Sequence, residues 1–184
     1  MKVVFTEDQI RQRVIELGTQ ISKDYAGEEL HVVGILESGV VFMADLMRLL
    51  DCRVVCHFVK MEMKDNFEGA QPVRYLIFGP MIDFRDKNVL LVDALVDSGI
   101  TLDYLVQQML VKKPKSLRTA ALFDRENGRR VSFHVDYAGF SWEGQHLIGY
   151  GMQKDGLYRN FPYVAAISPN HQPGAGAKGG AVTE

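Results

Sequence analysis

Two carboxylates and a short segment with glycine and hydroxyl side chains stand between a hydrophobic run and an amphipathic run. Asp93 and Asp97 precede the segment Ser98-Gly99-Ile100-Thr101. Glycine lets a backbone approach a ligand closely, the two hydroxyls can donate hydrogen bonds, and the start of a helix carries partial positive charge. These features favour an anion, above all a phosphate. The neighbouring carboxylates suit a sugar phosphate, whose hydroxyl groups and metal ion need acceptors.

The flanking residues predict a strand before this loop and a helix after it. Val89 to Val92 are all hydrophobic, as in a strand buried on both faces of a parallel sheet. From Leu102 the apolar residues recur with helical spacing, through Leu105 and Met109. The loop lacks the lysine of a Walker motif and the GxGxxG of dinucleotide folds. An ordinary strand–helix turn capped by serine and glycine is the alternative to a phosphate site.

The stretch from Val89 to Leu102 resembles the phosphoribosyl-diphosphate (PRPP) motif of type I phosphoribosyltransferases. That motif is a hydrophobic strand, two acids, two apolar residues and then Asp-Thr/Ser-Gly-x-Thr. The resemblance implies that Asp93 holds the ribose hydroxyls, directly or through magnesium, and that Asp97 is the catalytic acid/base for the purine proton at N7. Ala94 replaces the second acid of the motif, so restoring the pattern with Ala94→Asp together with Glu37→Lys is expected to lower the KM for PRPP. The implied 5-phosphate cradle is Ser98, Gly99, Ile100, Thr101 and Leu102.

A second strand–loop–helix unit is predicted from Leu30 to Leu36 and from Val40 to Leu50. Its helix start can also face an anion, and a plain connection is the alternative. The unit resembles the first loop of the hypoxanthine-guanine branch of the family, which holds pyrophosphate and carries a non-proline cis peptide, here at Leu36–Glu37. Glu37 stands where the family has lysine, so it sets a negative charge against the diphosphate. The pyrophosphate-binding residues implied are Glu37, Ser38, Gly39 and Arg159.

Three blocks near the end of the chain, 135–140, 147–151 and 157–163, resemble blocks of bacterial hypoxanthine phosphoribosyltransferases in the same order and spacing. Each block read alone is equally well explained by core aromatics and tight glycine turns. Together they extend the resemblance from about Val4 to Ile167.

The resemblance also implies a purine site. Arg125 replaces a lysine that contacts the six-position oxygen, His146 takes the place of a stacking aromatic residue, and Leu147 pairs with the base through its main chain. Gln153 stands where an aspartate helps to bind metal, and Arg129 is expected to help hold the diphosphate.

Length and charge limit the remaining possibilities. The chain has 184 residues and a net charge of −2, which fits one domain and gives no reason to expect nucleic-acid or membrane affinity. No stretch has the length of a membrane-spanning helix and the start is not a signal peptide, so a cytoplasmic protein is expected. Cys52 and Cys56 lie four residues apart in a predicted strand, which separates them by about 13 Å at ~3.3 Å per residue. This distance is too long for a disulfide. The two cysteines are therefore predicted to be buried thiols and not a metal-binding or redox pair.

Three further segments complete the prediction. Thr6 to Gln9 is a capping box that opens a helix with the apolar stripe Ile10, Val14, Leu17 and Ile21. Residues 61–80 are predicted to form a long, mobile hairpin. The resemblance implies that this hairpin is a flap that closes over the substrates, although the Ser-Tyr pair of the family flap is absent. A simple exposed hairpin is the alternative. Residues 168–184 are rich in glycine and alanine and predict a flexible tail after a domain at 1–167.

The resemblance as a whole implies an α/β type I phosphoribosyltransferase fold, with a mostly parallel twisted sheet flanked by helices and a small hood built from the chain ends. It implies magnesium-dependent transfer of ribose 5-phosphate from PRPP to N9 of hypoxanthine or guanine, in a homodimer or homotetramer. The departures at Glu37, Ala94, Arg125 and Gln153 leave two alternatives: a weak or inactive regulatory paralogue that binds nucleotide or PRPP, and a phosphoribosyltransferase for another base.

Overall fold

The larger of two sheets forms the centre of the molecule. The structure is a computed structural model that describes residues 1–64, 73–78 and 82–168. Five strands of this sheet are parallel, and β4 pairs antiparallel at one edge. In spatial order the strands are β4 (Val73–Phe78), β3 (Arg53–Lys64), β2 (Glu29–Leu36), β5 (Asn88–Val96), β6 (Ser116–Asp124) and β7 (Tyr137–Ser141).

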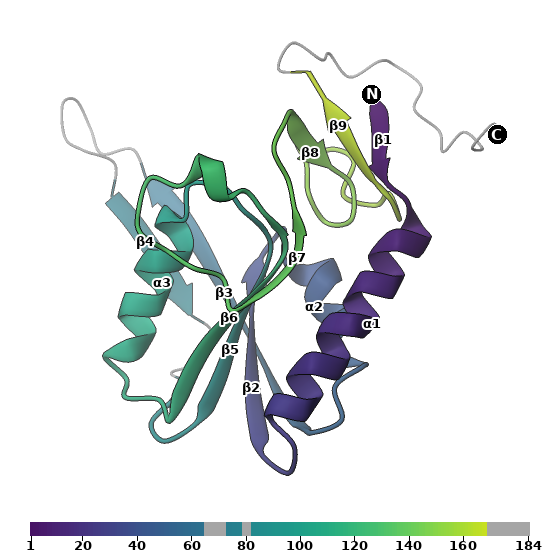
Figure 1. The fold of residues 1–184 in the computed structure, drawn as a ribbon. Helices are drawn as coiled ribbons and strands as arrows, with labels where there is room; N and C mark the ends of the chain where they lie inside the picture. Colours follow the sequence, from purple (N-terminus) through teal and green to yellow (C-terminus); the bar gives the residue numbers. More distant parts are fainter. Residues whose placement is uncertain (65–72, 79–81, 169–184) are drawn as a thin grey trace.

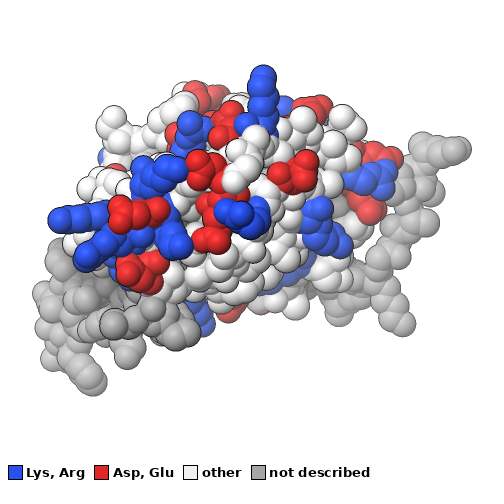
Figure 2. Space-filling view, turned by 90° about the horizontal axis from the view of Figure 1, so that it is seen from below, with Lys and Arg blue, Asp and Glu red and all other residues white. Residues whose placement is uncertain are grey.

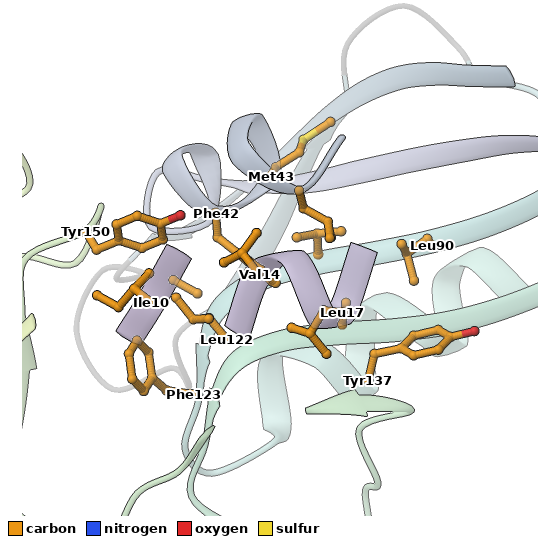
Figure 3. Packing of buried hydrophobic residues seen from close by; sticks show 14 of the residues in the cluster. Ile10, Val14, Leu17, Phe42, Met43, Leu90, Leu122, Phe123, Tyr137 and Tyr150 are labelled. Carbon is orange, nitrogen blue, oxygen red and sulfur yellow. The ribbon is translucent and has the colours of Figure 1, made fainter. Parts of the chain in front are cut away.

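Helices cover both faces of this sheet (Figure 1). Helices α1 (Glu7–Asp24) and α2 (Val40–Met47) share one core with residues of β2, β5 and β6, and α3 (Ile100–Leu110) shares a second core on the opposite face. The predicted capping box is present, with the Thr6 side chain accepting from the Gln9 amide and the Gln9 side chain accepting from the Thr6 amide. Figure 3 shows Ile10, Val14 and Leu17 of α1 directed into the first core.

A small antiparallel sheet forms the predicted hood. It contains β1 (Lys2–Phe5), β9 (Val164–Ile167) and β8 (His146–Ile148), in that order. The first and last strands of the described chain therefore lie side by side, and Figure 1 shows this sheet at one end of the molecule. The α/β architecture predicted from the sequence, with a mostly parallel sheet, flanking helices and a hood from the chain ends, is confirmed.

Two element boundaries differ from the predicted ones. Helix α2 ends at Met47 instead of Leu50, because Leu49 and Leu50 form turn hydrogen bonds to the residues three before them, and Ser22 of α1 accepts from the amide of Asp51. Strand β5 continues past Val92 to Val96, because its last residues pair in parallel register with the end of β6. The carboxylate of Asp93 is therefore a strand side chain.

The cysteines are free, as predicted, but Cys56 is exposed and Cys52 only partly buried, so the prediction of two buried thiols was wrong. Strand β4 pairs with β3 only from Val59 onward, and the first half of β3 lies at the margin of the sheet. The Cys56 Sγ lies 3.3 Å from the Sδ of Met47.

The predicted hairpin is confirmed in its strands, which pair from Val59–Phe78 to Lys64–Val73. Residues 65–72 and 79–80 of this hairpin, and all of the predicted tail at 168–184 except Ser168, lie outside the described residues. Within the described ranges, no helix is both long and apolar enough to cross a membrane.

The face opposite the hood carries mixed charge. Figure 2, seen from below, shows lysine and arginine side chains interspersed with aspartate and glutamate. Three ion pairs lie near the start of the strands, Lys87–Glu29 at 3.2 Å, Lys115–Glu28 at 2.9 Å and Arg118–Asp24 at 2.7 Å. Charges paired in this way produce no strong field of one sign.

Candidate active site

A cavity of ≈300 Å³ lies where β2 and β5 end. In a parallel sheet, this edge is where the following helices begin and where ligands bind. The predicted site residues that line the cavity are the acid/base residue Asp97 and the residues predicted for phosphate, ribose or pyrophosphate, which are Ser38, Asp93, Ser98, Gly99, Thr101 and Leu102. Ile100, also predicted, is the first residue of α3 and does not line it.

The β5–α3 loop, residues 97–99, requires its glycine. Gly99 has φ +76° and caps α3, and its carbonyl accepts from the amide of Asp103 at 2.9 Å. A Cβ here would lie 3.1 Å from Cδ of Arg129 and 3.1 Å from a methyl of Val131. The left-handed conformation and the close neighbours both exclude larger side chains, so the loop has one shape.

Asp93 is the buried carboxylate of the cavity, only 7% exposed. Its Oδ1 accepts from the Ser38 hydroxyl at 2.8 Å and from the amide of Ala94 at 2.7 Å. Burial raises the pKa of Asp93 to about 6, because the charged form loses hydration, while these hydrogen bonds act in the opposite direction. The side chain can therefore change charge state near neutral pH.

Ala94 does not face the ligand cavity. Side chains alternate along a strand, and Ala94 is fully buried in the core under α1 and α2 together with Val92 and Leu122. An aspartate at position 94 would enter that apolar core. The structure places position 94 in the core, and the effect of Asp at this position on PRPP binding stays a prediction.

Asp97 lies at the mouth of the cavity, beside the connection between β6 and β7 (residues 125–136). Arg125 Nη1 is 3.3 Å from its Oδ1, and both side chains are about half exposed. Gly128, in the 3₁₀ turn η1 (Glu126–Gly128), has no room for a Cβ because the Asp97 carboxylate occupies that space. The predicted acid/base residue is thus held between an arginine and a glycine.

The β2–α2 loop, residues 37–39, is held by packing from two sides. A Cβ on Gly39 would lie 2.8 Å from the carbonyl oxygen of Ile35 and 3.0 Å from that of Val92. On the other side Gly151, below the hood, packs directly on the carbonyl of Ser38. The implied cis peptide at Leu36–Glu37 is present.

Glu37 forms an ion pair with the other predicted pyrophosphate residue. Its Oε2 accepts from Arg159 Nη2 at 2.7 Å, and Lys60 Nζ is 4.0 Å from Oε1. Glu37 is 57% exposed and Arg159 31%. An exposed pair of this kind contributes only ~0.2–1 kcal/mol, so a ligand can displace it at small cost.

The predicted purine residues do not line the cavity, although Arg125 contacts Asp97 at its mouth. Of the residues described, Arg125, His146 and Leu147 are not among those that line it. His146 is exposed at the start of β8, and its Nε2 lies 3.0 Å from the carbonyl of Gln153, to which it donates. Leu147 is buried and pairs with Ala166.

Gln153, where the family has an aspartate, makes a local contact. Its side-chain oxygen accepts from the Gly156 amide at 2.6 Å and closes the turn below the hood. The structure therefore assigns this side chain to turn geometry.

Arg129, predicted to help hold the diphosphate, has a guanidinium that bonds to protein groups. The guanidinium pairs with Asp124 and donates to carbonyls of the β5–α3 loop. This arrangement joins residues about 30 positions apart, and no sequence pattern signals it.

Magnesium fits the site only together with a ligand. No group of three or more metal-binding side chains occurs among the residues described. Magnesium usually takes one or two carboxylates, with water and substrate phosphate oxygens completing its octahedron. Asp93, buried in a cavity of this size, is the carboxylate that would hold it.

A larger cavity, of ≈630 Å³, lies between α1, α2 and residues 159–162, and is lined mainly by apolar side chains. It contains Arg159, one of the predicted pyrophosphate residues, but none of the residues predicted for the 5-phosphate, the ribose or proton transfer. The chemistry of the site therefore points to the smaller cavity.

A profile described as a phosphoribosyl transferase domain matches residues 4–154. The chain belongs to the phosphoribosyltransferase family. The match covers both loops of the cavity and most of the residues singled out in the sequence.

Relatives with curated names place the chain near one branch of this family. It is 37% identical over 174 residues to a hypoxanthine-guanine phosphoribosyltransferase of Dictyostelium discoideum, covering 90% of this chain and 94% of that protein. It is 31% identical over 168 residues to the bifunctional protein TilS/HprT of Listeria innocua, covering 91% of this chain but only 26% of the bifunctional protein. The chain thus spans about a quarter of that longer relative.

Solved structures agree. A hypoxanthine-guanine phosphoribosyltransferase from Bacillus anthracis has a TM-score of 0.82 at 31% identity, over 91% of this chain and 98% of that one. A hypoxanthine phosphoribosyltransferase from Staphylococcus aureus has a TM-score of 0.84 at 29% identity, over 91% of each chain. The predicted resemblance to type I phosphoribosyltransferases of the hypoxanthine-guanine branch is confirmed.

Proposed function

We propose that the protein transfers the 5-phosphoribosyl group of PRPP to N9 of hypoxanthine or guanine. The bond between C1 of the ribose and the diphosphate oxygen breaks, and a bond from N9 to C1 forms. The base loses its N7 proton, and the products are IMP or GMP and pyrophosphate. The reaction serves purine salvage.

Different residues of the site bind the 5-phosphate, the ribose and the diphosphate and transfer the proton. The amides and hydroxyls of Ser98, Gly99 and Thr101 bind the 5-phosphate at the start of α3. Asp93 accepts hydrogen bonds from the ribose hydroxyls, and Asp97 takes the N7 proton as general base. Magnesium, when bound, neutralises charge on the diphosphate leaving group. Arg159, once released from Glu37, donates to the diphosphate.

The observation that supports this proposal most is the shape of the β5–α3 loop. Gly99 is left-handed, the loop lines a cavity at the start of a helix, and a buried carboxylate stands beside it. A phosphate ester that carries hydroxyl groups suits that combination.

The purine half of the site is supported by sequence position and by contacts at its edge. Arg125 bonds to Asp97, so a base that contacts Arg125 also lies near the proposed proton acceptor. The wider fork of arginine can donate to the six-position oxygen of an oxopurine.

The test is release of pyrophosphate from PRPP and magnesium in the presence of hypoxanthine, guanine, xanthine or adenine. Turnover with hypoxanthine or guanine and none with adenine is expected. A matched control is Lys115→Gln, which removes a charge of the Lys115–Glu28 pair at the far end of the sheet. Turnover with none of the four bases, in a protein that is folded and monodisperse, would contradict the proposal.

A second candidate is a regulatory protein that binds nucleotide or PRPP without turnover. The ion pairs Glu37–Arg159 and Arg125–Asp97 support it, because each occupies a residue that the reaction needs until a ligand displaces the pair. Titration of IMP and GMP by calorimetry, run beside the assay, distinguishes the two. Binding with no product for any base identifies the regulatory protein.

A further inference from the structure

The β5–α3 loop is held from behind by the β6–β7 connection. The amide of Arg125 donates to the carbonyl of Val96 at 2.9 Å, and the amide of Arg130 donates to that of Ser98 at 2.9 Å. Arg129 adds the side-chain contacts: its Nη1 donates to the carbonyls of Val96 at 3.0 Å and Asp97 at 2.7 Å. The carbonyls of three consecutive residues thus point toward one neighbouring segment.

Arg129 is itself fixed in place. Its Nη2 pairs with the carboxylate of Asp124, and its Nε donates to the carbonyl of Phe133 at 3.3 Å. The side chains of Arg129 and Asp124 are only 12% and 6% exposed. A buried, multiply bonded guanidinium has a fixed orientation, because its planar fork must satisfy several acceptors at once.

These contacts determine the direction of the loop amides. In a planar trans peptide, the N–H points opposite to the C=O of the preceding residue. Because the carbonyls of Asp97 and Ser98 point to the β6–β7 connection, the amides of Ser98 and Gly99 point to the other side. Ser98 and Gly99 line the cavity.

We propose that Arg129 is a positioning residue for the phosphate site. It holds the β5–α3 loop in the conformation that presents the amides of Ser98 and Gly99 to a phosphate monoester, and its guanidinium does not bind the ligand. The inference rests on the proposed function for the identity of the ligand class. If Arg129 has this role, the phosphate site also depends on β6. That strand contributes Asp124, which holds Arg129, but no residue that lines the cavity.

The test uses Arg129→Lys, which keeps a positive charge beside the buried Asp124 but loses the fork to the loop carbonyls. Ribose 5-phosphate is the probe, titrated by calorimetry, and amide spectra of the free proteins report on the loop. The matched control is Arg118→Lys, which weakens an Arg–Asp pair with Asp24 at the opposite end of the sheet. A thermal melt of each variant monitors the fold.

The expected result is at least a tenfold loss of ribose 5-phosphate affinity in Arg129→Lys, with shifted Ser98 and Gly99 amide resonances before ligand is added. Arg118→Lys should bind like the wild type. Affinity within twofold of the wild type in Arg129→Lys overturns the inference. So does a loss of affinity with unshifted Ser98 and Gly99 resonances, because that pattern indicates direct contact between Arg129 and the ligand.

If Arg129→Lys does not fold, the double variant Asp124→Asn with Arg129→Gln replaces the ion pair by a neutral pair. Ribose 5-phosphate affinity and the Ser98 and Gly99 amide resonances are then measured in that variant, with the same criteria. A wild-type protein that does not bind ribose 5-phosphate would overturn the proposed function and this inference with it. Normal wild-type binding with an unaffected variant overturns the inference alone.

Discussion

The two loops at the ligand edge of the sheet are built in different ways. Residues 97–99 follow β5 and are held by hydrogen bonds from the β6–β7 connection, and their glycine is left-handed. Residues 37–39 follow β2 and are held by packing between β5 and the turn below the hood, and their glycine is right-handed. The first loop therefore depends on hydrogen bonds with fixed direction, whereas the second depends on the position of the hood.

This difference predicts that the two loops tolerate substitutions to different degrees. A loop fixed by directional bonds presents its amides in one arrangement, which suits a constant group such as a 5-phosphate. A loop fixed by packing against another substructure can move with that substructure, which suits a group that must leave, such as pyrophosphate. Substitutions in the first loop should therefore have the larger effects.

The largest effect is expected from Asp97→Asn in the first loop. The amide cannot accept the N7 proton, so turnover should fall by ~10²–10⁴ while nucleotide affinity stays within a few-fold. Steady-state kinetics together with IMP calorimetry measure both quantities. Equal losses in turnover and affinity would show that Asp97 acts in binding and not in proton transfer.

The next effect concerns the left-handed glycine. Gly99→Val should abolish measurable ribose 5-phosphate binding, a loss of at least about 100-fold, because the valine is strained at positive φ and has no space beside Arg129. Gly27→Val is the matched control, since Gly27 has φ +77° with nothing within 4 Å. Both variants should lose about 1–2 kcal/mol of stability, and only Gly99→Val should lose affinity. Equal affinities would mean that the loop is not the phosphate site.

Asp93 links the two loops, because Ser38 of the second donates to it beside the first. With a pKa of about 6 in the folded protein, against an ordinary value of 3.8, Asp93 binds ribose hydroxyls or magnesium well only above pH 6. PRPP affinity should therefore fall more steeply below pH 6 in the wild type than in Asp93→Asn, in which only the phosphate groups of PRPP still take up protons. Binding titrations from pH 5 to 8 at constant ionic strength provide the measurement.

The stability of the fold depends on pH in the opposite direction from PRPP affinity. A raised carboxyl pKa stabilises the fold most below pH 3.8, and this contribution is lost as pH rises through about 6. The free energy of unfolding of Asp93→Asn, relative to the wild type, should therefore increase over this window by up to roughly 3 kcal/mol. A flat difference across the window would show that Asp93 is ionised throughout.

The smallest effect is expected in the second loop. Glu37→Gln removes an exposed ion pair with Arg159, so the KM for PRPP should fall only a few-fold, and less at high salt. Glu28→Gln at the far end of the sheet is the control for net charge. A rise in KM would instead assign Glu37 a favourable contact with the magnesium-bound ligand.

Much of the fold was predictable because its signals are local. The Thr6–Gln9 capping box and both strand–loop–helix units are patterns of neighbouring residues, and all are confirmed. The burial of Ala94 was not predicted, because the apolar run indicated a strand only from Val89 to Val92; in the longer β5, Ala94 follows Leu90 and Val92 into the same core. The reach of β5 depends on its pairing with β6, which no local pattern reports.

The contacts that shape the site were not predictable from one sequence. The Glu37–Arg159 pair joins residues 122 positions apart, and the bond from Arg129 to Asp97 joins residues 32 positions apart. Charged residues in loops usually indicate solvated turns, and only the fold brings these together. The exposure of Cys56 likewise follows from where β4 begins to pair with β3.

The pairing of β1 with β9 has a consequence for synthesis. Lys2 lies opposite Ala166, and Gly151 supports the loop at Ser38, so the second loop is complete only after the last strand has left the ribosome. At ~5–20 residues per second, β1 waits on the order of ten seconds or more for its partner. A nascent chain can form the sheet and the first loop during that interval. The capacity to hold pyrophosphate should then appear after the sheet and the first loop have formed.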